Sequence, residues 1–126
     1  MDVITEGSKR TPKIRADFDD GIIEISGISL PENAYDYFLP LHELLDNYIT
    51  NPRERTTLNF KMEYLNTGSA LSVRNLILKL NNKLPKGTLD VNWFYELDDI
   101  DILETGQELA SLFDNCTFQY IEVDEF

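Results

Sequence analysis

The chain has 126 residues, 42% of them hydrophobic and 11% aromatic, so it is rich enough in apolar side chains to fold as one domain with its own core. Its 23 acidic and 11 basic residues give a net charge of −12, which argues against binding to nucleic acid or to anionic membranes. The single cysteine, Cys116, excludes an internal disulfide. Without a secretory signal or an apolar run that could span a membrane, we expect a cytoplasmic protein.

The periodic part of the chain opens with two short strands joined by a tight turn. Residues 1–12 are polar and show no periodicity, so we expect a flexible tail there. Over residues 13–18 apolar and polar side chains alternate, which is typical of a half-buried strand. The Asp-Asp-Gly sequence at residues 19–21 predicts a hairpin turn, and the return strand should end near Gly27.

A helix, a strand and a second helix follow. From Asn33 to Thr50 apolar side chains recur three and four residues apart, which predicts an amphipathic helix. Residues 58–64 alternate strictly between apolar and polar types and predict the clearest strand of the chain. After a break at residues 66–69, the apolar positions between residues 73 and 84 predict the second helix.

The last third of the chain is strongly acidic. From Gly87 onward it contains eleven acidic residues and no lysine or arginine. A strand is predicted at residues 89–95, a helix after the acidic turn at residues 98–101, and a final strand at residues 117–123. Since large aromatic side chains alternate along the strand at residues 89–95, we expect both of its faces to be buried.

The predicted order is β-β-α-β-α-β-α-β over residues 13–126, which we interpret as a single α/β domain. Crossovers of this length favour parallel neighbours, so the sheet should be mixed, mostly parallel and packed with helices. Such folds present functional residues in the loops that lead from a strand into a helix. Two loops fit this description, Asn66–Ser69 and Asp98–Asp101.

The first loop, Asn66-Thr67-Gly68-Ser69, has two interpretations. Asn66 or Thr67 could cap the helix, with Gly68 allowing a tight turn, and spacing alone favours this structural role. Alternatively, a phosphate on Thr67 or Ser69 would lie at the positive end of the helix dipole. It would add about −1.5 to −2 charges, which is enough to prevent a partner from docking.

The second loop combines Asp98, Asp99 and Asp101 with Glu104. Carboxylates suit Mg²⁺ or Ca²⁺, but their spacing does not match a calcium-binding loop. We favour a first helical turn that complements the helix dipole, with Asp101 and Glu104 as a capping box. An acidic patch that faces a partner is a further option. The alternative function is a small acidic enzyme, or a ligand- or metal-binding domain, that uses these carboxylates.

No other residue type indicates a catalytic, metal or cofactor site. His42 lies beside the apolar face of the first predicted helix; as the only histidine, with no cysteine nearby, it is a poor metal site. Nothing nearby activates Cys116 as a catalytic thiol. The chain also lacks a glycine-rich loop that could cradle phosphates. We therefore expect no metal and no cofactor.

Four segments form an ordered set that covers nearly the whole domain. They are residues 27–34 (GISLPENA), 62–69 (MEYLNTGS), 91–96 (VNWFYE) and 98–106 (DDIDILETG). In the same order they resemble the SGxSxPENA, LEYFNTSS, xxNWYYE and DDEDMLEAGE segments of the SiaC family of bacterial regulatory phosphoproteins. The resemblance implies a fold similar to that of STAS-type anti-sigma-factor antagonists.

The resemblance also implies a function, that of the non-catalytic switch component of a partner-switching module. The family's phosphorylated threonine falls on Thr67, with Ser69 as the second choice. In this scheme a dedicated kinase phosphorylates the protein and a metal-dependent Ser/Thr phosphatase reverses the reaction. The unphosphorylated form binds and activates an effector, a diguanylate cyclase that makes cyclic di-GMP. The expected interaction surface consists of Asn66, Gly68, Ser69, Asp98, Asp99 and Asp101.

Overall fold

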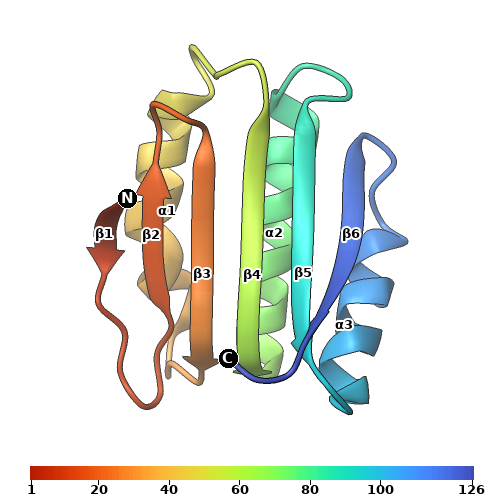
Figure 1. Cartoon of the computed structure of the whole chain (residues 1–126). Helices are drawn as coiled ribbons and strands as arrows, with labels where there is room; N and C mark the ends of the chain where they lie inside the picture. The colour runs from red at the N-terminus through yellow and green to blue at the C-terminus, as the bar shows by residue number, and fades with distance from the viewer.

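Six strands and three helices make up the chain in the computed structural model, which describes all 126 residues (Figure 1). The strands are β1 (Asp2–Thr5), β2 (Lys13–Asp17), β3 (Ile22–Ser29), β4 (Thr56–Leu65), β5 (Leu89–Glu96) and β6 (Cys116–Val123). The helices are α1 (Ala34–Tyr48), α2 (Thr67–Lys83) and α3 (Ile100–Ala110). The strands form one sheet in the order β1-β2-β3-β4-β5-β6, antiparallel from β1 to β3 and parallel from β3 to β6. The predicted mixed, mostly parallel α/β sheet is confirmed.

The hairpin predicted at residues 19–21 joins β2 to β3 and depends on its glycine. Gly21 has a φ of +69°, in the left-handed region that side chains disfavour. A Cβ atom at this position would also lie 2.5 Å from the carbonyl oxygen of Arg55 and 2.8 Å from the hydroxyl of Tyr48. Both the backbone conformation and the lack of space therefore require glycine here.

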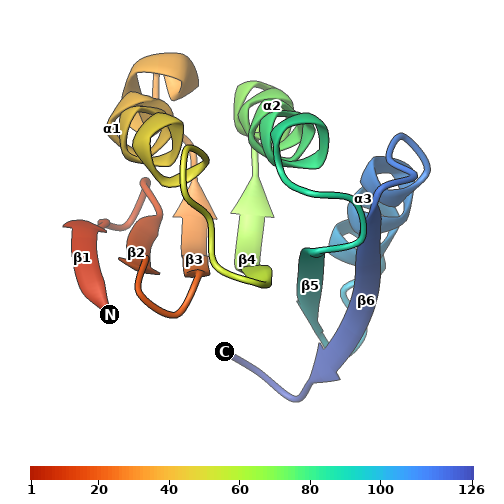
Figure 2. The same cartoon turned by 90° about the horizontal axis from the view of Figure 1, so that it is seen from above.

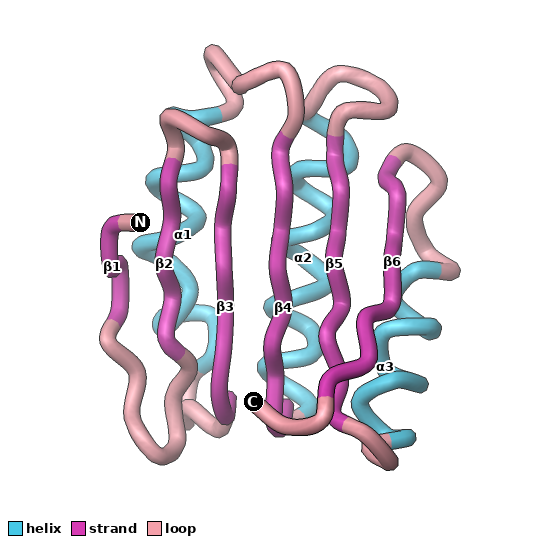
Figure 3. The backbone as a smooth tube through the Cα atoms, viewed as in Figure 1, coloured by secondary structure: helices cyan, strands magenta, loops and turns pink.

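Residues Asp2–Thr5 form strand β1, so the expectation of a flexible tail over residues 1–12 is wrong for this segment. Asp2 and Val3 pair with β2 in antiparallel register, at the edge of the sheet (Figure 3). The loop that follows β1 is fastened to α1, because the Tyr37 hydroxyl donates a hydrogen bond of 2.7 Å to the carbonyl oxygen of Pro12. Of the β1 side chains only Ile4 packs against the core. An edge strand with so little buried surface lacks the alternation from which strands are predicted.

All three helices cover the same face of the sheet and leave the opposite face open (Figure 2). The expectation that both faces of β5 are buried is therefore wrong. Trp93 is completely buried in the core beneath the helices. Phe94 is only half-buried on the open face, where the Lys61 ammonium lies 5.1 Å from its ring centroid. No helix covers this side of the sheet. None of the helices combines the length and the hydropathy needed to cross a membrane.

Polar side chains on the open face form ion pairs and hydrogen bonds with one another. The Glu24 carboxylate is 5% exposed and forms ion pairs with Arg15 and, at 2.7 Å, with Lys61. Burial alone would raise the pKa of Glu24, but the hydrogen bonds and charges of Lys61 and Arg15 outweigh it and lower this pKa. Asn92 and Asn59 are joined across β4 and β5 by a hydrogen bond of 2.9 Å.

Helix α3 approaches the sheet closely at Gly106. The indole nitrogen of Trp93 donates a hydrogen bond of 2.8 Å to the carbonyl oxygen of Ile102, one turn earlier in the helix. A Cβ atom at Gly106 would lie 2.5 Å from Cδ1 of the buried Trp93 ring. Glycine at this position lets α3 rest directly on the indole.

We predict that Gly106→Ala lowers the free energy of unfolding by about 1–3 kcal/mol, because the added methyl group overpacks the contact with Trp93. Gly68→Ala is the matched control, since Gly68 is also helical and its added Cβ would lie 3.7 Å from Ala34, an ordinary contact. This control should keep or raise stability, by up to about 1 kcal/mol. Urea denaturation measures both. Equal stability of the two variants would contradict the packing described for α3.

Candidate functional site

The two loops singled out from the sequence lie at the same edge of the sheet, where β4 and β5 end and α2 and α3 begin (lower edge in Figure 1). Tyr64 and Leu65 at the end of β4 share a small cavity of about 150 Å³ with Asp99 and Asp101 of the acidic turn. The structure thus brings together loops that are about 30 residues apart in the chain.

Asn66, and not Thr67, caps α2. The Asn66 side-chain oxygen accepts a hydrogen bond of 2.8 Å from the backbone N–H of Ser69. Thr67 is the first residue of the helix and is exposed to solvent, so its hydroxyl is left out of the capping interaction. Gly68 lies inside the helix without a positive φ, so the tight turn considered for it does not form.

Ser69 lies on the opposite side of the helix from Thr67 and is completely buried. Its hydroxyl oxygen is 2.6 Å from the hydroxyl oxygen of Ser29 and donates to the carbonyl oxygen of Ser29 at 3.1 Å. These contacts tie the first turn of α2 to the end of β3. Ser69 therefore contributes no surface, and its place in the expected interaction surface is corrected.

The acidic turn before α3 is built around Asp99. Its carboxylate accepts a hydrogen bond of 3.1 Å from the backbone N–H of Ile102 and caps the helix. The prediction of a capping box at Asp101 and Glu104 is wrong, because α3 already begins at Ile100. Asp98 has a φ of +68° and is exposed. No group of three or more histidine, cysteine or carboxylate side chains is arranged to hold a metal ion.

Exposed apolar side chains lie at the same edge of the sheet as Thr67, and sequence reasoning missed them. They lie at or just after the ends of β4 and β5 and in the first two turns of the three helices, and each is 47–67% exposed: Tyr35, Tyr64, Leu71, Leu97 and Ile100. The available signal was that these residues fall outside the apolar stripes of their own elements. Exposed apolar side chains at one edge of a fold are a feature of protein–protein contacts.

His42 and Cys116 lie elsewhere and are not poised for chemistry. Burial and the charge of Lys79 lower the pKa of His42, against the opposing effect of Asp46, so the imidazole is neutral at neutral pH. Burial and the charges of Asp114 and Asp90 raise the pKa of the Cys116 thiol. A thiol with a raised pKa is a poor nucleophile.

Comparison with known families identifies the chain over almost its full length. The model of the SiaC family regulatory phosphoproteins matches residues 5–123. The chain belongs to the SiaC family. The resemblance inferred from the four sequence segments is thereby confirmed. An uncharacterized protein of Pseudomonas aeruginosa (strain UCBPP-PA14) is 23% identical over 120 residues, which cover 94% of this chain and 93% of that protein.

Solved structures of the same family share the fold. SiaC of Pseudomonas aeruginosa superposes with a TM-score of 0.77 at 21% identity, covering 96% of this chain and 97% of that one. The crystal structure of apo-SiaC from the same organism gives a TM-score of 0.76 at 22% identity, covering 97% and 98%. A chain in the crystal structure of the diguanylate cyclase SiaD in complex with its activator SiaC gives 0.73 at 21% identity, covering 94% and 95%.

The buried serine pair leads to a stability prediction. Ser69→Ala leaves the buried Ser29 hydroxyl without its partner and should cost about 1–3 kcal/mol of unfolding free energy. The double variant Ser29→Ala/Ser69→Ala should lose less than the sum of the two single variants, because no orphaned hydroxyl remains. Thr67→Ala is the control and should change stability by less than about 0.5 kcal/mol. Denaturant titration decides between these outcomes, and strict additivity would contradict the pairing.

Proposed function

We propose that the protein is a non-catalytic phospho-switch, reversibly phosphorylated on Thr67. The observation that carries this proposal is the contrast within one helical turn: Thr67 is exposed at the start of α2, whereas Ser69 is buried and hydrogen-bonded to Ser29. A kinase can reach the first hydroxyl on the folded protein. It can reach the second only if α2 unwinds. Membership of a family of regulatory phosphoproteins supports the presence of such a site.

The local structure can accept a phosphate at Thr67 without rearrangement. The first backbone N–H groups of a helix lack partners within the helix, and its dipole favours negative charge at this end. Asn66 satisfies only the N–H of Ser69. No acidic side chain occupies the first turn of α2, so a phosphate meets no repulsion from within the turn. Phosphorylation should therefore change the surface and leave the core intact.

We propose that the unphosphorylated form binds and activates a diguanylate cyclase. SiaC of Pseudomonas aeruginosa is the activator of the diguanylate cyclase SiaD in the crystal structure of their complex. In the present chain, the exposed apolar side chains at the edge that carries Thr67 supply a docking surface, together with Asn66, Gly68, Asp98, Asp99 and Asp101. About two negative charges placed on this surface would oppose docking.

Two further partners follow from a reversible switch. We propose that a dedicated kinase phosphorylates Thr67 and that a metal-dependent Ser/Thr phosphatase removes the phosphate. Thr67 stands on a helix terminus at the edge of the sheet, so both enzymes can approach it from solvent. No observation favours the alternative of an enzyme built on the acidic turn, because the Asp99 carboxylate is engaged in capping α3.

The phosphorylation site can be tested in the native host. Mass spectrometry of the purified protein should find one added phosphate on the peptide that contains Thr67. Thr67→Ala should abolish the modification, whereas Ser69→Ala should retain it on the folded fraction, because the Ser69 hydroxyl is buried. Normal modification of Thr67→Ala, together with its loss in Ser69→Ala, would assign the phosphate to Ser69 and overturn the proposal.

The gating of the cyclase can be tested with a charge mimic. Thr67→Glu should weaken binding to the host's diguanylate cyclase at least tenfold, or about 1.4 kcal/mol, whereas Thr67→Ala should bind as the wild type does. The mimic carries less charge than a phosphate, so phosphorylation of Thr67 should weaken binding more than Thr67→Glu does. Isothermal titration measures the affinity, and melting temperatures control for folding. A collapsed melting temperature in Thr67→Glu would show that charge acts by unfolding α2, contrary to the surface mechanism.

A further inference from the structure

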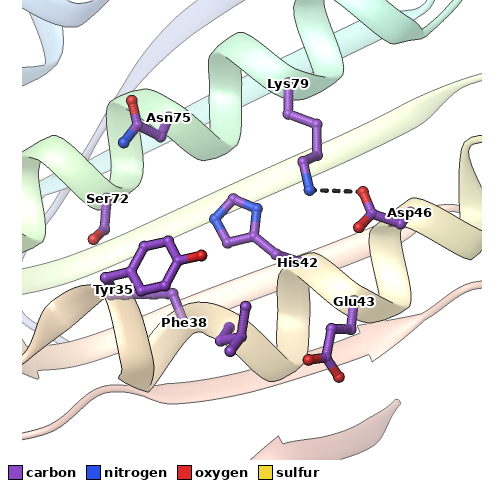
Figure 4. A pocket seen from close by; sticks show the side chains of 9 residues that line it. Tyr35, Phe38, His42, Glu43, Asp46, Ser72, Asn75 and Lys79 are labelled. Carbon is purple, nitrogen blue, oxygen red and sulfur yellow. Dashed lines mark hydrogen bonds and ion pairs between the residues drawn. The ribbon is translucent and has the colours of Figure 1, made fainter.

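Strand β6 forms one edge of the sheet, and the outer side of its backbone has no partner. The order of the strands places β6 beside β5 alone (Figure 3). Helix α3 packs on the face of the sheet, where Gly106 lies against the Trp93 ring of β5. Half of the eight residues of β6 are exposed, namely Thr117, Gln119, Tyr120 and Glu122. The edge is therefore accessible from solvent along most of its length. The cavity of about 310 Å³ between α1 and α2 is a weaker candidate, because the Lys79 ammonium and the Asp46 carboxylate on its two sides already pair with each other at 2.7 Å (Figure 4).

The hydrogen bonds of β6 identify which of its backbone groups face outward. The N–H of Leu97, just after β5, donates a hydrogen bond of 2.8 Å to the carbonyl oxygen of Val123. The backbone groups of Val123 therefore point toward β5, and so do those of every second residue before it in the strand. The residues between them, Phe118, Tyr120 and Glu122, direct their N–H and C=O groups away from the sheet. No backbone group of a loop or of another strand bonds to these outward groups.

The opposite edge of the sheet is protected against pairing with another chain, whereas β6 is not. Strand β1 has only four residues, and its register with β2 shifts between Val3 and Thr5. Short edge strands, irregular register, lysine and proline are the devices that keep an edge from pairing with a further strand. Strand β6 has eight residues, contains neither lysine nor proline, and pairs with β5 in continuous register. It is thus a ready template for one more strand.

The charges around β6 select the kind of strand that fits this edge. From residue 87 onward the chain has eleven acidic residues and no lysine or arginine. Asp114 precedes β6, and Glu122, Asp124 and Glu125 lie at its other end, while residues 117–121 are uncharged. Pairing with a second copy would bring two such acidic segments together, which like-charge repulsion opposes. A strand with basic ends and uncharged β-branched residues between them complements the edge.

We propose that β6 binds an extended segment of a partner protein, basic at both ends, as a seventh strand of the sheet. The outward N–H and C=O groups of Phe118, Tyr120 and Glu122 supply the main-chain hydrogen bonds that hold it. The rings of Phe118 and Tyr120 are neighbours on one face, with centroids 5.6 Å apart, and apolar residues of the added strand pack beside them. Its terminal cations lie near Asp114 and Glu122. This surface includes neither Thr67 nor its loop, so the inference goes beyond the proposed function and does not depend on it.

A synthetic peptide tests the edge. The probe is the acetylated and amidated peptide Lys-Lys-Val-Thr-Val-Thr-Lys-Lys, and isothermal titration measures its affinity for the full chain. Tyr120→Pro removes an outward N–H donor without removing a hydrogen bond to β5, so it should weaken binding about tenfold or more. Tyr120→Thr keeps the N–H and should bind within about threefold of the wild type. Equal affinities of these two variants, both folded, would overturn the proposal.

A second pair of variants tests whether the attraction is local to β6. Glu122→Lys reverses the charge on the strand and should weaken binding of the peptide about fivefold. Glu43→Lys makes the same change at an exposed residue of α1 and should weaken it less than about twofold. Equal losses in both variants would show that the peptide follows the net charge of the protein, contrary to the proposal.

Hydrogen exchange of the wild-type protein gives an answer that requires no variant to fold. With the peptide bound, the amide protons of Phe118, Tyr120 and Glu122 should exchange about tenfold more slowly or less, whereas those of Gln119 and Ile121, which face β5, should change little. Unchanged exchange at the three outward residues, or no binding of the peptide, would overturn the proposal. Self-association of the chain alone that Tyr120→Pro abolishes would assign the edge to a second copy, and would also overturn it. None of these results bears on the switch proposed at Thr67.

Discussion

Each crossover between neighbouring parallel strands is right-handed, and this places all three helices relative to the sheet. Strands β3 to β6 follow one another in the sheet in the same order as in the chain, so each crossover passes over the same face. All three helices consequently cover that face, and all three begin at one edge (Figure 1). Tyr35, Thr67 and Ile100, which are far apart in the sequence, thereby lie along the same edge of the sheet. The opposite face is left to polar residues such as Glu24, which are paired there.

A local arrangement then decides which of the two hydroxyls at the start of α2 is accessible from solvent. Successive residues of a helix are rotated by about 100°, so Thr67 and Ser69 point to nearly opposite sides of α2. The inward hydroxyl binds Ser29 and anchors the helix to β3, while Asn66 caps its end. The outward hydroxyl takes part in neither contact. A charge can therefore appear at Thr67 while the anchoring of α2 is preserved, which is the physical requirement for a switch that acts through its surface.

Local patterns predicted most of the fold and the two loops of the site, but not their tertiary context. The strands and helices after residue 13 follow from apolar periodicity, and the hairpin from its Asp-Gly turn. Strand β1 escaped prediction because an edge strand held by main-chain hydrogen bonds needs no alternation. The open face beside Phe94 follows from the strand order, which no local pattern encodes. For the same reason the sequence could not separate Thr67 from Ser69, since their burial depends on the packing of α2 against Ser29.

The rate of cyclic di-GMP synthesis by the host's diguanylate cyclase would show whether Thr67 acts as the proposed switch. It is measured at one concentration of this protein, either unphosphorylated or phosphorylated on Thr67, with the melting temperature of both forms as a control. In the proposed mechanism the phosphate changes the surface and not the fold, and the unphosphorylated form should stimulate synthesis. The phosphorylated form should give less than a tenth of that stimulation while melting at the same temperature. Equal stimulation by both forms would contradict the claim that Thr67 is the switch.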